Sequence, residues 1–391
     1  MKIKVKPEDF IVEEIIDAVP QKKGEYALYK LRKKEENTVE TLRQIAGNLR
    51  LPFSNFAYGG RKDKHALAFQ HITIKSTQPR QRIEGKNYSL DLLGFLDRPM
   101  EPDLIAANRF TVTIRSLSEA EVAGISEEIP LIESFGFPNY FDDQRFGSLD
   151  PRQGFLAEKI LKKHYNGALK IYLTRLSSQD RKEDRERKEF FFENWDHPQN
   201  CLRKARTPFE KAAFGHLEKK PKDFIFLLRK IPREDLSLYY SSYQAFLWNE
   251  VLRRGLKLKV KDPLKLYKGL AGDYFFYTAI DSADLESFKN SRLFTPASNI
   301  KISDAEMSKL YGQVLEENNL RLPMFNITKI RHVFFKGVAR AVCVTPRQLT
   351  FDFLKDDVYQ NHHKCELRFL LPRGSYATML VKRLFAVTVP A

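Results

Sequence analysis

One stretch combines the residue types that chemistry on a phosphate-bearing substrate would need. Residues 56–70 read FAYGGRKDKHALAFQ, so that two glycines precede a cationic run with Asp63 inside it. Glycines let a backbone approach a ligand closely, and clustered cations attract phosphate. Neighbouring positive charges favour the ionised form of a carboxylate, so Asp63 is predicted to be a permanent anion. It suits a nucleophile or an electrostatic stabiliser better than a proton donor. The alternative is a solvated turn whose charges pair locally.

The charge balance of the whole chain indicates a polyanionic partner. Among 391 residues, 66 Lys and Arg outnumber 50 Asp and Glu, and the formal net charge is +16. RNA, DNA and an anionic membrane surface are the candidate partners. No apolar run approaches the roughly 20 residues of a membrane-spanning helix, and the N-terminus MKIKVKPEDF lacks the apolar segment of a signal peptide. We therefore expect a nucleic-acid partner, no membrane, and two domains.

Cysteine and histidine usage argues against a metal centre. Cys201, Cys343 and Cys365 are few and far apart, which fits neither a disulfide framework nor a Cys-rich zinc site. His362 and His363 are adjacent, and neighbouring side chains on a strand point to opposite faces. We expect no structural metal and a reducing, cytoplasmic location.

Three further positions offer groups that could contact a nucleobase. Phe10 follows a turn in PEDFIVEE and is either a core residue or a stacking platform. Asn108 begins the strand NRFTVTIR and has amide donors and acceptors for a base edge, although a turn residue at a strand start is the commoner role. Aromatic residues in 136–147 either stack on bases or brace a tight loop, and bracing is the commoner outcome. At the end of the chain, Tyr376 lies between a strand and a predicted helix.

Hydrophobic periodicity predicts the elements that must position these residues. Alternation predicts strands at 2–15 (interrupted by Pro7), 26–31, 68–74, 108–115 and 365–371. Apolar stripes and capping residues predict helices at 37–49, 118–134, 155–163, 239–252 and, with Ser375 as its cap, 375–385. The dense charges at 182–188 are typical of a solvated helix face. Residues 255–335 give no clear elements. If 56–70, 108–115 and 372–378 converge, the middle of the chain is an insertion.

At this point the sequence resembles a known family. Six motifs occur in the family order from Lys4 to about Arg383, and they resemble those of the TruD family of tRNA pseudouridine synthases. The match is weak only at about 170–230 and 255–335. The motifs are KPEDFIVEE, YGGRKDKHALAFQ, NRFTVTIR, PNYFDDQRFG, SSYQAFLWN and LPRGSYATML.

The resemblance implies an α+β fold with a discontinuous catalytic domain. Residues 1–153 and 345–391 would form the pseudouridine synthase domain, with a mixed, mainly antiparallel sheet. Residues 154–344 would form an inserted α/β TRUD domain. The implied partner is tRNA, and we expect a monomer.

The resemblance also assigns roles to residues. Asp63 takes the place of the catalytic aspartate. Phe10, Asn108 and Phe110 match substrate-binding positions, and Tyr376 matches an aromatic position that is phenylalanine in some members. Lys4 and Glu14 match charged positions near the site. Lys62 and Arg145, with Arg61 and Lys64, are expected to hold phosphates.

The implied reaction isomerises uridine, at position 13 of tRNA, to pseudouridine. It breaks an N–C glycosidic bond and rejoins the base through carbon, so no redox cofactor or metal is required. The target base must leave its stack, and aromatic stacking of roughly 1–3 kcal/mol per base offsets that cost. Two other classes stay open. One is a non-catalytic RNA-binding protein with the same fold. The other is a phosphoryl-transfer enzyme that would bind magnesium through Asp142 and Asp143.

Overall fold

The chain forms two compact units in a computed structural model that describes residues 1–76, 78–302, 304–330 and 332–388. Unit 1 comprises Met1–Phe137 and Val344–Phe385. Unit 2 comprises Pro138–Cys343 and the segment that starts at Ala386. Each unit is described by itself.

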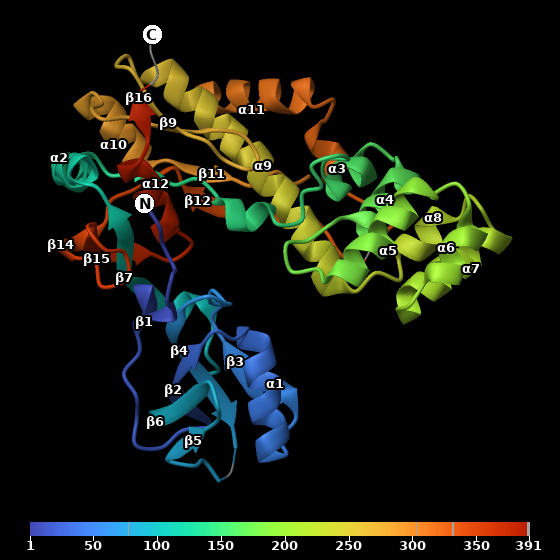
Figure 1. The fold of residues 1–391 in the computed structure, drawn as a ribbon, viewed down its shortest axis with the longest axis horizontal. Coiled ribbons are helices and arrows are strands. Elements are labelled where there is room, and N and C mark those ends of the chain that lie inside the picture. Colours follow the sequence, from blue (N-terminus) through green and yellow to red (C-terminus); the bar gives the residue numbers. More distant parts are fainter. Residues whose placement is uncertain (77, 303, 331, 389–391) are drawn as a thin grey trace. The chain divides into compact units, whose positions relative to one another are not determined.

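Unit 1 is built on a nine-stranded sheet with the order β14-β15-β7-β1-β4-β2-β6-β5, and β3 pairs with β4 beside this path (Figure 1). The pairing of β1 with β4 is parallel and the other pairings are antiparallel. The predicted α+β class with a mainly antiparallel sheet is therefore confirmed. The strands are β1 (Phe10–Ile16), β2 (Tyr26–Lys34), β3 (Phe56–Tyr58), β4 (Leu67–Lys75), β5 (Arg82–Glu84), β6 (Tyr88–Leu96), β7 (Ile105–Leu117), β14 (Arg347–Lys355) and β15 (His363–Pro372).

Strands from the two separate segments of unit 1 lie side by side in this sheet. The long strand β7 has β1 on one side and β15 on the other. Leu371 of β15 pairs with Asn108 of β7, and on the other side Asn108 pairs with Glu14 of β1. An element from the last 30 residues of the chain thus lies next to the strand that contains Asn108.

Helix α1 (Thr38–Leu49) covers one face of the sheet. Its apolar stripe, which includes Leu42 and Ile45, packs on buried side chains such as Leu31 and Ile72 (Figure 1). Asn37 caps the helix, because its side chain accepts a hydrogen bond from the backbone N–H of Val39. The sequence prediction for this helix and its cap is confirmed.

Helices α2 (Glu119–Phe135) and α12 (Ala377–Leu384) pack on each other in unit 1. Ser118 and Glu121 form a reciprocal capping box at the start of α2. Arg383, at the end of α12, is 1% exposed and donates to the carboxylate of Glu128 in α2. This buried ion pair joins the C-terminal segment to the N-terminal part of the unit.

Unit 2 is mainly helical, with α4 to α8 gathered as one group (Figure 1). The long helix α9 packs on α3 and α11. β16 pairs with β9 and β9 with β10, while β11 pairs with β12. The helices are α3 (Leu156–Leu161), α4 (Tyr165–Thr174), α5 (Lys182–Glu193), α6 (Pro198–Lys204), α7 (Pro208–Lys219), α8 (Phe224–Leu228), α9 (Arg233–Lys259), α10 (Ser282–Asn290) and α11 (Ala305–Glu317). The strands are β9 (Lys265–Tyr267), β10 (Tyr274–Phe276), β11 (Arg292–Phe294), β12 (Ala339–Ala341) and β16 (Val387–Thr388), while β8 (Phe137–Pro138) and β13 (Cys343–Val344) fall where the chain changes unit.

The division between units differs from the predicted domain boundary near 153/154. Arg340 donates to the carbonyl oxygens of Asn139 and Tyr140, and the side chain of Asn249 bonds both backbone groups of Phe141. These bonds attach the start of the PNYF motif to unit 2. Its aromatic residues are buried, so they brace the chain, which was the expected commoner outcome. The pairing of β16 likewise places 386–388 in unit 2, whereas the prediction assigned 345–391 to the catalytic domain. Residues 389–391 lie outside the described residues.

Some predicted ends of helices and strands are wrong, because contacts with distant residues determine where these elements begin and end. The prediction that Ser375 caps the last helix is wrong, because the helix begins at Ala377 and Tyr376 is its N-cap residue. Only Lys2 of residues 2–6 pairs with a strand, through a bridge to Arg115. Helix α9 extends well beyond 239–252 at both ends. Among the described residues, no helix is long and apolar enough to cross a membrane.

We predict that Arg383→Met destabilises unit 1 by about 3 kcal/mol. The substitution takes the guanidinium partner from the buried Glu128 carboxylate, and broken buried ion pairs are costly. Urea unfolding followed by circular dichroism measures the change. Lys75→Met is the matched control, because it breaks the exposed ion pair with Glu25 and is expected to leave the unfolding midpoint nearly unchanged. Equal midpoints for both variants would contradict the prediction.

Candidate active site

Asp63 lies in the loop between β3 and β4, directly before the strand that pairs with β1. Buried and partly buried hydrogen bonds hold this loop against the start of α1. The backbone N–H of Lys62 donates to the Thr38 hydroxyl at 3.2 Å, and that hydroxyl donates to the Gln70 side chain at 3.0 Å. Gln70 in turn donates to the carbonyl oxygen of Gly60 at 3.4 Å. The loop is therefore a defined structure rather than a free charged turn.

The two carboxylate oxygens of Asp63 have different partners. Oδ1 accepts a hydrogen bond from the backbone N–H of His65 at 3.0 Å, which closes a local turn. Oδ2 accepts from the ammonium group of Lys4. The Asp63 side chain retains 19% exposure. The carboxylate is thus oriented and paired, yet still reachable from solvent.

Lys4 adopts an uncommon backbone conformation to make this contact. Its φ is +57°, in the left-handed region that few residues other than glycine adopt. Its ammonium group also lies 4.3 Å from the ring centroid of Phe10. The ion pair with Asp63 and the cation–π contact with Phe10 both offset the cost of that backbone conformation.

Aromatic rings form the apolar side of the cluster. Phe10 packs edge-on against Phe110 with centroids 6.1 Å apart, and Phe110 stacks on Phe369 of β15 at 5.7 Å. Phe10 and Phe110 are 5% and 7% exposed. They form a packed wall with little exposed ring face, which differs from the open stacking platform considered for Phe10.

Asp9 and Arg115 hold the turn before Phe10 in place. Arg115, on β7, donates to both carboxylate oxygens of Asp9 at 2.9 Å and also to Asp356 and Asp357. These hydrogen bonds, led by those to Asp9, raise the pKa of the Arg115 guanidinium above its already high value. The Asp9–Arg115 ion pair is buried and links the PEDF turn to the sheet. It therefore fixes the position of the backbone from which the Phe10 side chain extends.

A chain of polar contacts connects Glu14, Lys62 and Asn108. The ammonium group of Lys62 donates to Oδ1 of Asn108 at 2.6 Å and lies 2.8 Å from Oε1 of the fully buried Glu14. Lys62 was expected to hold phosphate, but the structure directs its ammonium group inward to two protein acceptors.

His71 completes the surroundings of Glu14. Its backbone N–H donates to Oε2 of Glu14 at 2.7 Å. Its ring is 8% exposed, and burial together with nearby Lys30 and Lys62 lowers its pKa to about 4. The imidazole is therefore neutral at neutral pH and adds no charge beside Glu14.

Direct contacts thus form two groups, one of Lys4, Phe10, Asp63 and Phe110 and the other of Glu14, Lys62 and Asn108. Because Lys62 precedes Asp63 in the chain, we call the two groups together the Asp63 cluster. Tyr376 follows β15 and is partly exposed, four residues after the pair formed by Pro372 and Ala107. Arg145 belongs to unit 2, where it contacts Ser241 and Phe141. The predicted phosphate contact of Arg145 stays a prediction.

The acidic pair required by a phosphoryl-transfer enzyme is used for packing in unit 2. Oδ1 of Asp143 accepts hydrogen bonds from the Tyr274 hydroxyl and from the backbone N–H of Leu270, both at 2.8 Å. Asp142 is 3% exposed. Within the described ranges, His, Cys, Asp and Glu side chains form no group of three that could hold a metal ion.

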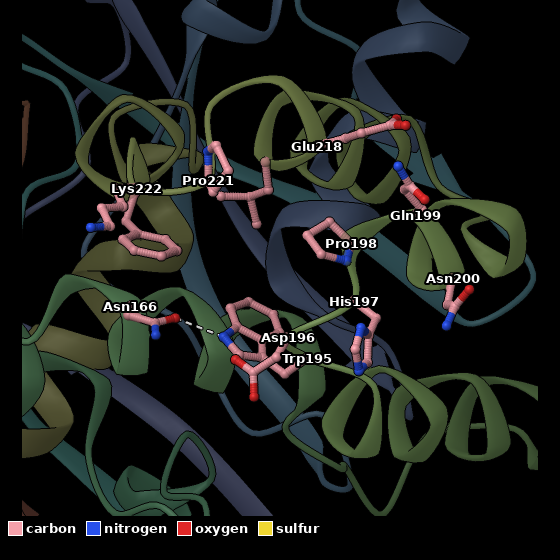
Figure 2. A pocket seen from close by; sticks show the side chains of 12 residues that line it. Asn166, Trp195, Asp196, His197, Pro198, Gln199, Asn200, Glu218, Pro221 and Lys222 are labelled. Carbon is pink, nitrogen blue, oxygen red and sulfur yellow. Dashed lines mark hydrogen bonds between the residues drawn. The ribbon is translucent and has the colours of Figure 1, made fainter.

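A separate pocket of about 770 Å³ lies in unit 2, among α4 and α6 to α8. Figure 2 shows Trp195 among the lining residues, with its indole N–H directed at Asn166; this hydrogen bond is 2.7 Å long, and polar side chains such as His197 also line the pocket. None of its lining residues belongs to the Asp63 cluster or to the other candidate residues from the sequence. The candidate site is therefore defined by the contacts in unit 1.

Asp9, Arg115 and Lys33 are not among the site residues predicted from the sequence. Asp9 was inside the quoted PEDF motif, and Arg115 ended the NRFTVTIR strand on its polar face, but neither has a local pattern that reveals a partner 106 residues away. Lys33 had a usable signal, because it continues the buried alternation of Tyr29 and Leu31 on one face of β2.

Comparison with known proteins gives the family. Residues 1–384 match the family model "tRNA pseudouridine synthase D (TruD)". The "Probable tRNA pseudouridine synthase D 2" of Methanocaldococcus jannaschii is 30% identical, covering 98% of this chain and 92% of the relative. The "tRNA pseudouridine synthase D" of Aquifex aeolicus is 27% identical over 100% of this chain and 99% of its own. A crystal structure of a TruD protein from Methanosarcina mazei superimposes with a TM-score of 0.71 at 23% identity, over 98% and 92% of the two chains.

The chain therefore belongs to the TruD family of tRNA pseudouridine synthases, which isomerise uridine. The match to the M. mazei structure shows that the fold is shared.

We predict that His71 makes unit 1 less stable in acid. The pKa of His71 is about 4 when folded and lies near 6.5 when unfolded, so between these values the unfolded chain binds a proton that the folded chain does not. The free energy of unfolding should fall from pH 6.5 to pH 4, with a share from His71 of up to about 3 kcal/mol. His71→Gln removes that share, and His362→Gln, at an exposed position, is the control. Urea unfolding midpoints at pH 7 and pH 5 measure this loss of stability. If the midpoint of His71→Gln changes between the two pH values by as much as that of the wild-type protein, the prediction is refuted.

Proposed function

We propose that this protein converts uridine at position 13 of tRNA to pseudouridine, with Asp63 as the nucleophile. The observations that support the proposal best are two contacts of the loop between β3 and β4: Lys4 pairs with Asp63, and Lys62, the residue before Asp63, bonds Asn108 of β7. The Asp63 carboxylate is oriented and partly exposed, and the residue before it bonds an amide of the kind that can bind a base, which supports this proposal. We further propose that unit 1 is the catalytic domain and unit 2 the inserted TRUD domain, in a monomer of the cytoplasm.

The reaction needs a carboxylate that is close to an extruded nucleotide. The bond between ribose C1′ and uracil N1 breaks, the base turns, and C1′ bonds to C5, while the C5 proton is lost and N1 gains one. Asp63 either attacks C1′, giving a glycosyl ester, or removes the C2′ proton to start an elimination. Both routes use an ionised carboxylate, and the ammonium group of Lys4 favours that ionised form.

Asn108 would orient the flipped uracil. Because Lys62 binds Oδ1 of its amide, Nδ2 is the group that can donate to a uracil carbonyl oxygen. Glu14 attracts the Lys62 ammonium group and so supports this amide orientation. Lys62 thus contributes to substrate binding through Asn108 rather than through a phosphate.

The aromatic residues would enclose the base. Phe10 and Phe110 form an apolar wall, and the more exposed ring of Tyr376 would stack on the base. Base flipping costs a few kcal/mol, which stacking and pocket hydrogen bonds can offset. Arg61, Lys64 and Arg145 would bind tRNA phosphates, in keeping with the net charge of +16.

We predict that Asp63→Asn binds tRNA with an affinity near that of the wild-type protein but loses at least about 1000-fold in turnover. The amide keeps the shape of the side chain but cannot act as a nucleophile or base at neutral pH. Tritium release from tRNA labelled at uridine C5 measures turnover, and filter binding measures affinity. Asp97→Asn is the matched control, because that exposed aspartate bonds only Gln21 among the described residues. Turnover by Asp63→Asn at the wild-type rate would refute the assignment and would leave open a non-catalytic RNA-binding protein with the same fold.

We predict that the target is a single uridine. A tRNA transcript with uridine at position 13 should release one equivalent of tritium, and the same transcript with cytidine there should release none. Mapping pseudouridine by carbodiimide treatment and primer extension locates the product. Full release from the cytidine-13 transcript would show that another uridine is the target.

A further inference from the structure

We propose that Lys33 is a positioning residue for the reaction, holding the backbone of Asp63 in its working place. The inference rests on the proposed role of Asp63. Lys33 is near the end of β2, in the charged stretch LRKKEE, and unlike its neighbours Arg32 and Lys34 its side chain is fully buried. Its ammonium group donates to the carbonyl oxygen of Asp63 at 2.7 Å and to that of Glu36 at 2.8 Å.

The two acceptors belong to different elements, and this makes Lys33 a bridge. Asp63 lies in the catalytic loop, while Glu36 comes directly before Asn37, the cap of α1. The loop is thereby tied to the start of a helix that packs on the sheet core. Thr38 and Gln70 bond Lys62 and Gly60, whereas Lys33 bonds Asp63 itself.

A buried ammonium group is costly, so its presence calls for a reason. Position 33 continues the face of β2 that buries Tyr29 and Leu31, where an apolar residue would pack without desolvation. An apolar side chain could not bond two backbone carbonyl oxygens that converge at this point. A requirement for a fixed position of the Asp63 backbone would explain why a buried lysine, and not an apolar residue, occupies position 33.

The placement matters because Asp63 must reach a reacting carbon. Lys4 and the N–H of His65 fix the orientation of the carboxylate, but they do not fix where the loop backbone lies relative to the strands. A shift of about 1 Å in a reacting group can cost about 100-fold in rate. Lys33 therefore acts through Asp63, without touching substrate.

The ionisation of Lys33 gives this role a pH signature. Burial lowers its pKa to about 8, opposed by the negative charges of Asp63 and Glu36 and assisted by the positive charge of Lys62. Tyr88, at the paired position in β6, and Tyr29, four residues earlier on the same face of β2, are further titratable side chains on this face. A neutral amine is a weaker donor than an ammonium group. Its hold on the Asp63 carbonyl oxygen weakens as pH rises through 8.

The test compares Lys33→Met with Lys34→Met in the full chain. Lys34 is the neighbouring lysine on the opposite face of β2, half exposed and paired with Glu8 at 2.7 Å. We measure single-turnover tritium release at saturating enzyme, tRNA affinity and the urea midpoint, from pH 7 to pH 9. Lys33→Met is expected to lose about 10- to 100-fold in the single-turnover rate constant, with tRNA affinity changed less than about threefold. Lys34→Met is expected to retain the wild-type rate.

The pH profile separates positioning from general stability. The wild-type rate constant should fall by up to about tenfold from pH 7 to pH 9, as Lys33 loses its proton, and Lys33→Met should lack that fall. A wild-type rate in Lys33→Met, or the same fall with pH in that variant, overturns the proposal. If Lys33→Met does not fold, a wild-type rate constant that is flat over this range also overturns it.

The outcome for Asp63→Asn distinguishes the two proposals. If Asp63→Asn is inactive while Lys33→Met has the wild-type rate, the positioning role fails and the proposed function stands. If Asp63→Asn is active, the proposed function fails, and the role of Lys33 fails with it.

Discussion

The position of β1 between β4 and β7 is the constraint on which the candidate site depends. Its parallel pairing with β4 places the PEDF turn next to the end of the loop that contains Asp63. Its antiparallel pairing with β7 sets Glu14 opposite Asn108 and Phe10 opposite Val112. One strand thus brings together side chains from three separate stretches of sequence. A register slip of one residue would turn Phe10 and Glu14 to the opposite face.

The site combines buried charges that compensate one another. Lys4 pairs with Asp63 and Lys62 with Glu14, while Lys33 bonds backbone carbonyl oxygens. Desolvated ion pairs give little net stability, so their value here lies in geometry. Each ammonium group fixes a different part of the site: the carboxylate, the amide of Asn108, and the loop backbone.

Much of this arrangement could be predicted from the sequence, because the motifs are short and local. The strand alternation around Asn108 and the capped helix after Asn37 are properties of neighbouring residues, and the structure confirms both. The contacts of Arg115 and the inward direction of Lys62 could not be predicted, since they depend on partners brought close only by the sheet. The elements within residues 255–335 could not be predicted for a related reason. Strands of three residues, such as β9 and β11, are too short for alternation to be recognised.

The strand order also has a consequence for synthesis on the ribosome. β15 occupies the edge of β7 opposite β1, and it comes from the last part of the chain. The ribosome therefore synthesises β1 to β7 first, then residues Pro138–Cys343 of unit 2, and only afterwards the strand that pairs with the other edge of β7. During that interval an unpaired strand edge is exposed, which is a hazard for aggregation and an entry point for chaperones. The N-terminal segment of unit 1 is therefore expected to complete its sheet only after β15 has been synthesised.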